Sequence, residues 1–183
     1  MRPSRGKTSR RLTAAMLGLA AAGAAAGCGN GDESAYRPLQ DGDAAPAFAA
    51  PTLAGDTVTL EDLRGSVVML NIWATWCIPC REEMPALQSL HERYGGEGLR
   101  VVGVSIDARA ASESVAMFVQ DFGVSFTILH DPTDHVTRAF RAAGVPSTFL
   151  IGRDGRIRHR WIGRFQPEAS ETIALVEAAL RAY

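Results

Sequence analysis

The sequence lacks a long apolar run, a second cysteine pair and an excess of basic side chains in its main part. The uncharged run Leu12–Ala26 would reach roughly 22 Å as a helix, short of a hydrocarbon core of roughly 30 Å, so we do not expect a permanent transmembrane helix. From residue 28 onward, 14 basic side chains stand against 20 acidic ones, a net charge of −6, which argues against nucleic acid as a partner. The globular composition and length predict one packed domain.

The first 27 residues have the pattern of a signal peptide. Five basic residues and no acidic one occupy this segment, in which an uncharged run follows the basic start. The run ends at Ala25–Cys28, small residues followed by a cysteine, which resembles the bacterial site where a lipid is attached to that cysteine. We therefore expect cleavage after residue 27, lipidation of Cys28, a polar tether over residues 28–40 and a domain over residues 41–183, on the extracytoplasmic side of a membrane. Ordinary secretion with a free thiol is the alternative.

Beyond the tether, the apolar pattern alternates between strand and helix. The run Val67–Trp73 is nearly continuous and rich in β-branched residues, as in a central strand covered on both faces. The turn sequence Gly152–Gly155 predicts an antiparallel hairpin. The order predicts a three-layer α/β domain with a mixed sheet. We expect strands at 57–60, 67–73, 99–106, 126–129, 148–151 and 157–162, and helices at 77–94, 112–122, 131–142 and 167–182.

The pair Cys77 and Cys80 lies where the central strand is expected to end and a helix to begin. A helix N-terminus favours a thiolate because of its unpaired amides and its dipole, and it lowers the pKa of a thiol there. This pattern predicts thiol–disulfide exchange, in which the Cys77 thiolate attacks a substrate disulfide and the more buried Cys80 resolves the mixed disulfide. Trp76 is expected to offer an apolar surface to the substrate.

Three other uses of the cysteine pair compete with exchange. A zinc site needs four ligands, and the sequence has no second pair. A structural disulfide would close only a short loop and stabilise the fold little. A copper carrier would need a histidine such as His130 or His135 as a further ligand. We expect those two, with His91 and His159, to occupy ordinary loop or surface positions, and we expect no metal and no cofactor.

Two segments resemble the thioredoxin-like proteins of the ResA/TlpA type. Trp73–Pro85 is similar to their active-site segment and Gly144–Ile151 to their second signature, and the resemblance runs from about residue 42 to 183. It implies a thioredoxin fold, three-layer α/β/α with a mixed central sheet, to which we expect an N-terminal β-hairpin to be added. In that family the proline matching Pro146 is cis and faces the cysteines, and the backbone of the preceding residue, here Val145, pairs with an extended substrate.

Two positions bear on proton transfer. Asn71 stands where cytosolic thioredoxin has a buried aspartate six residues before the first cysteine, and an amide cannot take that proton. Glu83 matches a glutamate that ResA-type proteins place near their cysteines, which implies that it exchanges the proton of Cys80 during resolution. The alternative places Glu83 on the helix surface, where it only complements the helix dipole.

The resemblance also implies an activity and partners. It implies an extracytoplasmic thiol-disulfide oxidoreductase that reduces protein disulfides, commonly those of apocytochrome c before haem attachment, with electrons from a membrane thiol reductase. A peroxiredoxin-like thiol peroxidase is one alternative, although its nucleophile normally lies in a Thr-rich motif without a CxxC pair. A non-enzymatic copper-binding module is another.

Overall fold

The computed structural model of the chain describes residues 37–182. The predicted signal peptide, the predicted lipidation site Cys28 and most of the predicted tether lie outside the described residues. Within residues 37–182, no helix combines the length and the apolar character that crossing a membrane requires.

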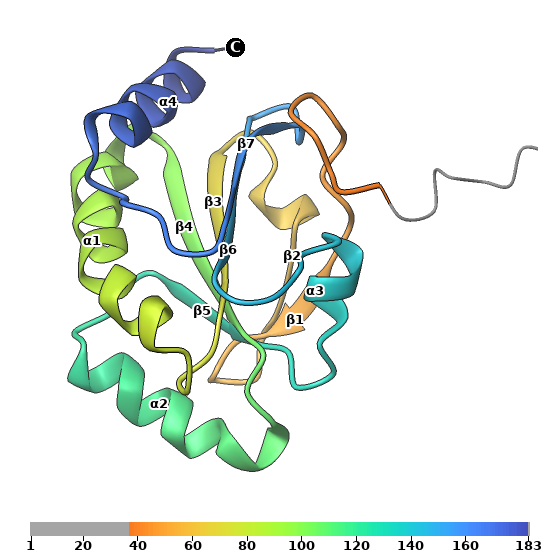
Figure 1. The fold of residues 1–183 in the computed structure, drawn as a ribbon, viewed down its shortest axis with the longest axis vertical. Coiled ribbons are helices and arrows are strands. Elements are labelled where there is room, and N and C mark those ends of the chain that lie inside the picture. Colours follow the sequence, from red (N-terminus) through yellow and green to blue (C-terminus); the bar gives the residue numbers. More distant parts are fainter. Residues whose placement is uncertain (1–36, 183) are drawn as a thin grey trace, which may run out of the picture. The chain divides into compact units, whose positions relative to one another are not determined.

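A five-stranded mixed sheet with the order β5-β4-β3-β6-β7 forms the centre of the described domain (Figure 1). Strands β3, β4 and β5 are parallel, whereas β6 is antiparallel to β3 and β7 is antiparallel to β6. Every residue of β3 is buried, so the nearly continuous apolar run correctly predicted the central strand. The strands are β3 (Val67–Trp73), β4 (Leu99–Ser105), β5 (Thr127–His130), β6 (Ser147–Ile151) and β7 (Ile157–Ile162).

Helices and a hairpin cover the two faces of this sheet (Figure 1). Met69 and Trp73 of β3 pack with α1, α2 and α4, whereas Leu70 and Ile72 pack with α3 and the hairpin, because successive side chains of a strand point to opposite faces. This arrangement confirms the three-layer prediction and the N-terminal hairpin. The covering elements are β1 (Ala49–Pro51), β2 (Thr57–Thr59), α1 (Ile78–Tyr94), α2 (Ser112–Asp121), α3 (His135–Ala139) and α4 (Ser170–Arg181), with short 3-10 turns η2 (Glu61–Leu63), η3 (Gly95–Glu97) and η4 (Arg109–Ala111).

Helix α3 is shorter than the predicted 131–142. The reason is Asp131, whose carboxylate accepts hydrogen bonds from the Thr133 hydroxyl at 2.6 Å and from the Val136 amide at 2.7 Å. These bonds favour a turn before the helix over a helical start. At the other end, Arg141 has a φ of 51°, in the left-handed region that ends a helix. The other predicted strands and helices lie within three residues of their expected ends.

Candidate active site

Cys77 lies in the loop that leaves the carboxyl end of β3, at the edge where the three parallel strands end. It is the N-cap residue of α1, and its Sγ accepts a hydrogen bond from the Cys80 amide at 3.3 Å. Pro79 sits in the first turn, where its missing N–H removes no helical hydrogen bond. The strand-to-helix placement predicted for the pair is therefore the observed one.

A disulfide joins Cys77 to Cys80, whose Cα atoms are 5.3 Å apart. Cys77 is 5% exposed and Cys80 is 1% exposed, so Cys77 is the more exposed residue of the pair. Both cysteines belong to the core cluster that includes Trp73 and Met84. The pair is thus packed into the face of the sheet that α1, α2 and α4 cover.

Glu83 is buried, at 2% exposure, although it lies in an otherwise polar turn of α1. Its Oε1 accepts a hydrogen bond from the Phe165 amide at 2.9 Å, and its Oε2 has no hydrogen-bond partner. Burial raises the pKa of Glu83 from its usual 4.5 to about 7, against the opposing effects of the Phe165 amide and the Arg164 charge. The surface position considered as an alternative is therefore wrong. Glu82 is the exposed neighbour and pairs with Arg164 at 3.1 Å.

Asn71 lies in β3 and is buried among the central strands. Its Nδ2 donates to the Thr148 hydroxyl at 2.9 Å across the β3–β6 pair, and its Oδ1 has no hydrogen-bond partner. Asn71 is two residues from both Met69 and Trp73 in the strand, so its side chain points to the same face of the sheet, the one that α1 and the cysteines cover. A neutral amide occupies this place, which leaves Glu83 as the buried carboxylate on α1.

The segment before β6 lies far from the cysteines in the sequence but packs against the same core cluster. The Val145–Pro146 peptide bond is cis, as the resemblance implied, and Pro146 is buried. Val145 is partly buried and packs against the core cluster that contains Cys77 and Cys80. The Pro146 carbonyl accepts a hydrogen bond from the Gly163 amide at 2.9 Å, which ties this loop to the end of β7.

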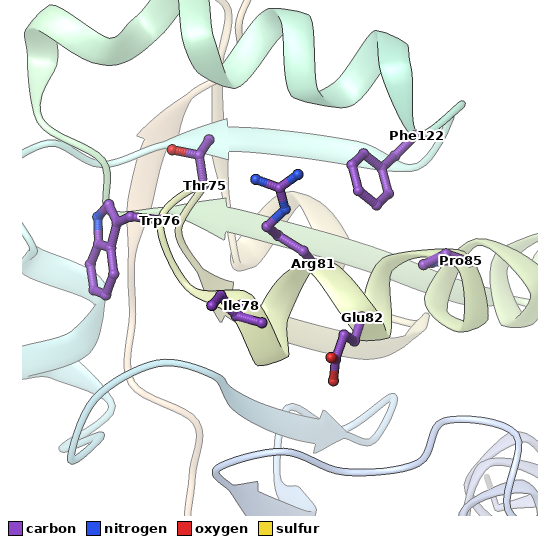
Figure 2. Close-up of a pocket in the computed structure, with 7 residues that line it drawn as sticks. All are labelled: Thr75, Trp76, Ile78, Arg81, Glu82, Pro85 and Phe122. Atoms are coloured by element: carbon purple, nitrogen blue, oxygen red, sulfur yellow. The ribbon is translucent and has the colours of Figure 1, made fainter.

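An apolar pocket of about 460 Å³ is lined in part by the two residues that flank Cys77 in the sequence (Figure 2). Trp76 and Ile78, on either side of Cys77, are 65% and 70% exposed. Figure 2 shows Arg81 pointing from α1 toward α2, where its guanidinium carbon lies 5.7 Å from the centre of the Phe122 ring. Sequence reasoning missed Ile78, Arg81 and Phe122. For Ile78, its place as an apolar residue between the two cysteines was a signal that could have found it. The pocket is lined by Thr75, Trp76, Ile78, Arg81, Glu82, Pro85 and Phe122.

Asp107 is a further residue that sequence reasoning missed. Its side chain is buried just beyond β4, and its carboxylate accepts hydrogen bonds from Thr75 in the loop before Cys77. An acidic residue directly after a buried strand, at the carboxyl edge of a parallel sheet, was the signal that could have found it.

The histidines differ in part from expectation. His135 is exposed, and His91 and His159 are partly exposed. His130 is wrongly predicted: it is a buried residue of β5, and its Nε2 lies 2.9 Å from the Asp107 carbonyl oxygen. Among residues 37–182, no group of three His, Cys, Asp or Glu side chains is placed to hold a metal ion.

Comparisons with known proteins agree with this geometry. The sequence matches the AhpC/TSA family over residues 42–160. The thiol-disulfide oxidoreductase ResA of Bacillus thuringiensis (strain Al Hakam) is 33% identical over 133 residues, which cover 73% of this chain and 76% of ResA. The thioredoxin-like protein YneN of Bacillus subtilis (strain 168) is 34% identical over 134 residues, which cover 73% of this chain and 78% of YneN.

Solved structures show the same relationship. A crystal structure from Chlorobium tepidum, assigned as a thiol:disulfide interchange protein DsbE, superposes with a TM-score of 0.72 at 34% identity. The match covers 78% of this chain and 99% of that chain. Together with the disulfide at the start of α1, these similarities show that the chain belongs to the AhpC/TSA family and is a thiol-disulfide oxidoreductase of the ResA-like, thioredoxin-fold group.

Proposed function

We propose that the protein reduces disulfides of other proteins outside the cytoplasm, and that a lipid on Cys28 holds it at the membrane. The observation that carries the proposal is the Cys77–Cys80 disulfide, which caps α1 beside the exposed Trp76. A buried structural bridge needs no exposed apolar residue next to it, whereas a reactive one needs a surface on which the partner can rest. Among substrates, we propose the cysteine pair of apocytochrome c before haem attachment.

The reaction proceeds in two exchanges. The Cys77 thiolate attacks one sulfur of the substrate disulfide, and the other substrate sulfur leaves as a thiolate that takes up a proton. The Cys80 thiolate then attacks the Cys77 sulfur, so the mixed disulfide breaks and the second substrate thiol is released. The substrate gains two electrons and the protein becomes the Cys77–Cys80 disulfide. A membrane thiol reductase returns the two electrons.

The start of α1 favours Cys77 as the attacking sulfur. The Cys80 amide points at the Cys77 Sγ, and the helix dipole adds positive potential at the same place. Both effects stabilise a thiolate more than a thiol, so they lower the pKa of Cys77 in the reduced protein. Cys80, inside the first turn and less exposed, is the resolving sulfur.

In the proposed reaction, Glu83 accepts the proton of Cys80 and returns it. It follows Cys80 by three residues on α1, a spacing that places two side chains on neighbouring positions of a helix. A pKa of about 7 lets a carboxyl group accept and return a proton near neutral pH. Because Oε1 is held by the Phe165 amide, Oε2 is the oxygen that carries the proton.

Trp76, Val145 and Pro146 form the proposed substrate-binding surface. The Val145 backbone pairs with an extended substrate segment, and the Trp76 ring covers the apolar side chains next to the substrate cysteine. The pocket behind Trp76 and Ile78 extends this surface toward α2. A loosely folded protein can lie across such a surface more easily than a compact one, which favours unfolded, newly exported chains as substrates.

Trp76→Ala is expected to raise the KM for a protein disulfide by about tenfold, because the loss of a large exposed aromatic contact typically costs on the order of 1 kcal/mol or more. The rate with oxidised glutathione should change little, since that small disulfide makes few contacts beyond the sulfurs. Met117→Ala is the matched control, because Met117 is also an exposed apolar residue but lies on α2 outside the pocket lining. Equal losses with both disulfides would contradict a substrate-binding role for Trp76.

The membrane anchor gives a second prediction. The mature protein is expected to begin at an acylated Cys28 and to fractionate with membranes, whereas Cys28→Ser is expected to be released or left uncleaved. Intact-mass spectrometry of the mature protein checks this directly. An unmodified Cys28 thiol in the mature protein would exclude the anchor.

The activity itself is tested with the reduced protein and a peptide that carries a Cys-x-x-Cys-His disulfide. Stoichiometric reduction of the peptide, with formation of the Cys77–Cys80 disulfide, is expected. Hydrogen peroxide and Cu(I) are tested in parallel. Rapid peroxide consumption without peptide reduction would favour the peroxidase, and tight Cu(I) binding without exchange would favour the copper-binding module.

A further inference from the structure

Asp107 is a buried carboxylate that the proposed reaction does not use. It is 1% exposed and lies just after β4. Its Oδ1 accepts a hydrogen bond from the Thr75 hydroxyl at 2.6 Å, and its Oδ2 accepts bonds from the Thr75 amide at 2.9 Å and from the Ser105 hydroxyl at 2.8 Å. Two of the three donors therefore come from one residue, two positions before Cys77.

Asp107 is itself held firmly in place. Its amide donates to the Ser105 hydroxyl at 3.1 Å, and its carbonyl oxygen lies 2.9 Å from the ring of His130 on β5. Hydrogen bonds through Asp107 thus join the carboxyl ends of β4 and β5 to the loop that follows β3. In that loop the Cys77 amide donates to the Ala74 carbonyl at 3.1 Å, so the chain turns tightly around Thr75.

We propose that Asp107 is a positioning residue for the exchange reaction, which fixes Cys77 at the N-terminus of α1 by holding Thr75. Burying a carboxylate costs free energy unless it accepts hydrogen bonds from nearby donors. The Asp107 carboxylate accepts all three of its hydrogen bonds only when the loop occupies this position. The hydrogen bonds from Thr75 to Asp107, in addition to packing, therefore hold the loop in this position. This inference rests on the proposed role of Cys77 as the attacking sulfur.

Positioning matters because the Cys77 thiolate depends on alignment. The hydrogen bond from the Cys80 amide and the helix dipole act only over the first turn, so a displaced loop weakens both. A shift of a reacting group by about 1 Å can slow a reaction by up to about 100-fold. Loss of the Thr75–Asp107 contact should therefore change the chemistry of Cys77 as well as the stability of the fold.

Two substitutions each remove one of the hydrogen bonds between Thr75 and Asp107. Asp107→Asn keeps the shape but replaces one accepting oxygen with an amide group that cannot accept. Thr75→Val keeps the shape and the Asp107 charge but loses the hydroxyl donor. Thr75→Ser retains both donors and is the conservative variant that should restore function.

Thr133→Val is the matched control. The Thr133 hydroxyl donates to Asp131 at 2.6 Å, so this variant removes a threonine–aspartate bond of the same kind outside the loop of Cys77.

The experiment uses the full-length reduced protein. The pKa of Cys77 is measured from the pH dependence of its alkylation rate, and exchange with a protein disulfide is followed at pH 7, together with the melting temperature. Asp107→Asn and Thr75→Val are expected to raise the pKa of Cys77 and to slow exchange by about tenfold. Thr75→Ser and Thr133→Val are expected to leave both close to the wild-type values, even if Thr133→Val lowers the melting temperature.

Unchanged thiol pKa and exchange rate in Asp107→Asn and Thr75→Val would overturn the inference and leave Asp107 a purely structural residue. The inference would also be overturned if the pKa of Cys77 fell in Asp107→Asn and did not change in Thr75→Val. That result would show that Asp107 acts on Cys77 through its negative charge and not by positioning the loop. If Asp107→Asn does not fold, Thr75→Val decides alone. Substrate trapping by Cys77→Ser instead of Cys80→Ser would refute the assigned order of the cysteines, a separate result from the pKa comparison.

Discussion

Cys80→Ser is expected to accumulate mixed disulfides with substrate proteins, whereas Cys77→Ser is expected to form none and to lose exchange activity. Cys77 caps α1 with a sulfur that accepts the hydrogen bond from the Cys80 amide, and it is the more exposed residue of the two. With Cys80 removed, no neighbouring thiolate can attack the mixed disulfide, so the trapped species persists. Non-reducing electrophoresis after acid quenching, followed by mass spectrometry of the captured bands, measures the difference.

The double variant Cys77→Ser/Cys80→Ser is the control for non-specific capture. Any band that it shares with Cys80→Ser does not count as a trapped substrate. Equal trapping by the two single variants would show that the assigned order of attack is wrong, while leaving the exchange activity of the pair intact.

Glu83→Gln is expected to remove a pH dependence from the stability of the oxidised protein. The pKa of Glu83 is about 7 in the folded protein and 4.5 in its usual environment, so between these pH values the folded state keeps a proton that the unfolded state has released. The free energy of unfolding therefore falls as the pH rises from about 4.5 to about 7, by at most about 3 kcal/mol, and then levels off. Denaturant unfolding at pH 5 and pH 8 measures this slope.

The same variant should alter the cysteines of the reduced protein. Removal of a negative charge lowers the pKa of at least one of them, and removal of the proton acceptor slows exchange. Glutamine keeps an oxygen for the Phe165 amide, so folding should be nearly intact. Glu82→Gln is the matched control, because it removes the same charge from an exposed neighbour. An unchanged stability slope and an unchanged thiol titration in Glu83→Gln would refute the proton-transfer role.

Local patterns in the sequence predict most of the fold and the centre of the site. The apolar run Val67–Trp73 can be buried on both sides only as a central strand, and the pair that follows it caps the next helix. The resemblance of the second signature to the ResA/TlpA-type family implied the cis bond before Pro146, which is confirmed. These features depend on short stretches of sequence, so they can be read without the three-dimensional structure.

Other features depend on residues that are distant in the sequence. Glu83 is hydrogen-bonded to the Phe165 amide, which is 82 residues away in the sequence. The sequence of α1 alone therefore resembles a helix with a polar surface there and does not reveal that Glu83 is buried. Thr75 lies in the active-site segment, but its partner Asp107 is 32 residues away and belongs to neither family signature. The length of α3 was overestimated because Asp131 bonds the turn before it, a choice between local hydrogen bonds that apolar spacing does not show.

The redox state of Cys77 and Cys80 in cells tests the proposed reductase function most directly. Growing cells are quenched in acid, free thiols are alkylated with a reagent that adds mass, and the pair is quantified by mass spectrometry. A reductase supplied with electrons is kept as the dithiol, so the pair should be mostly alkylated and should become oxidised when the electron supply is withdrawn. A pair found mostly as the disulfide in unperturbed cells would contradict the proposal and identify the protein as an electron acceptor.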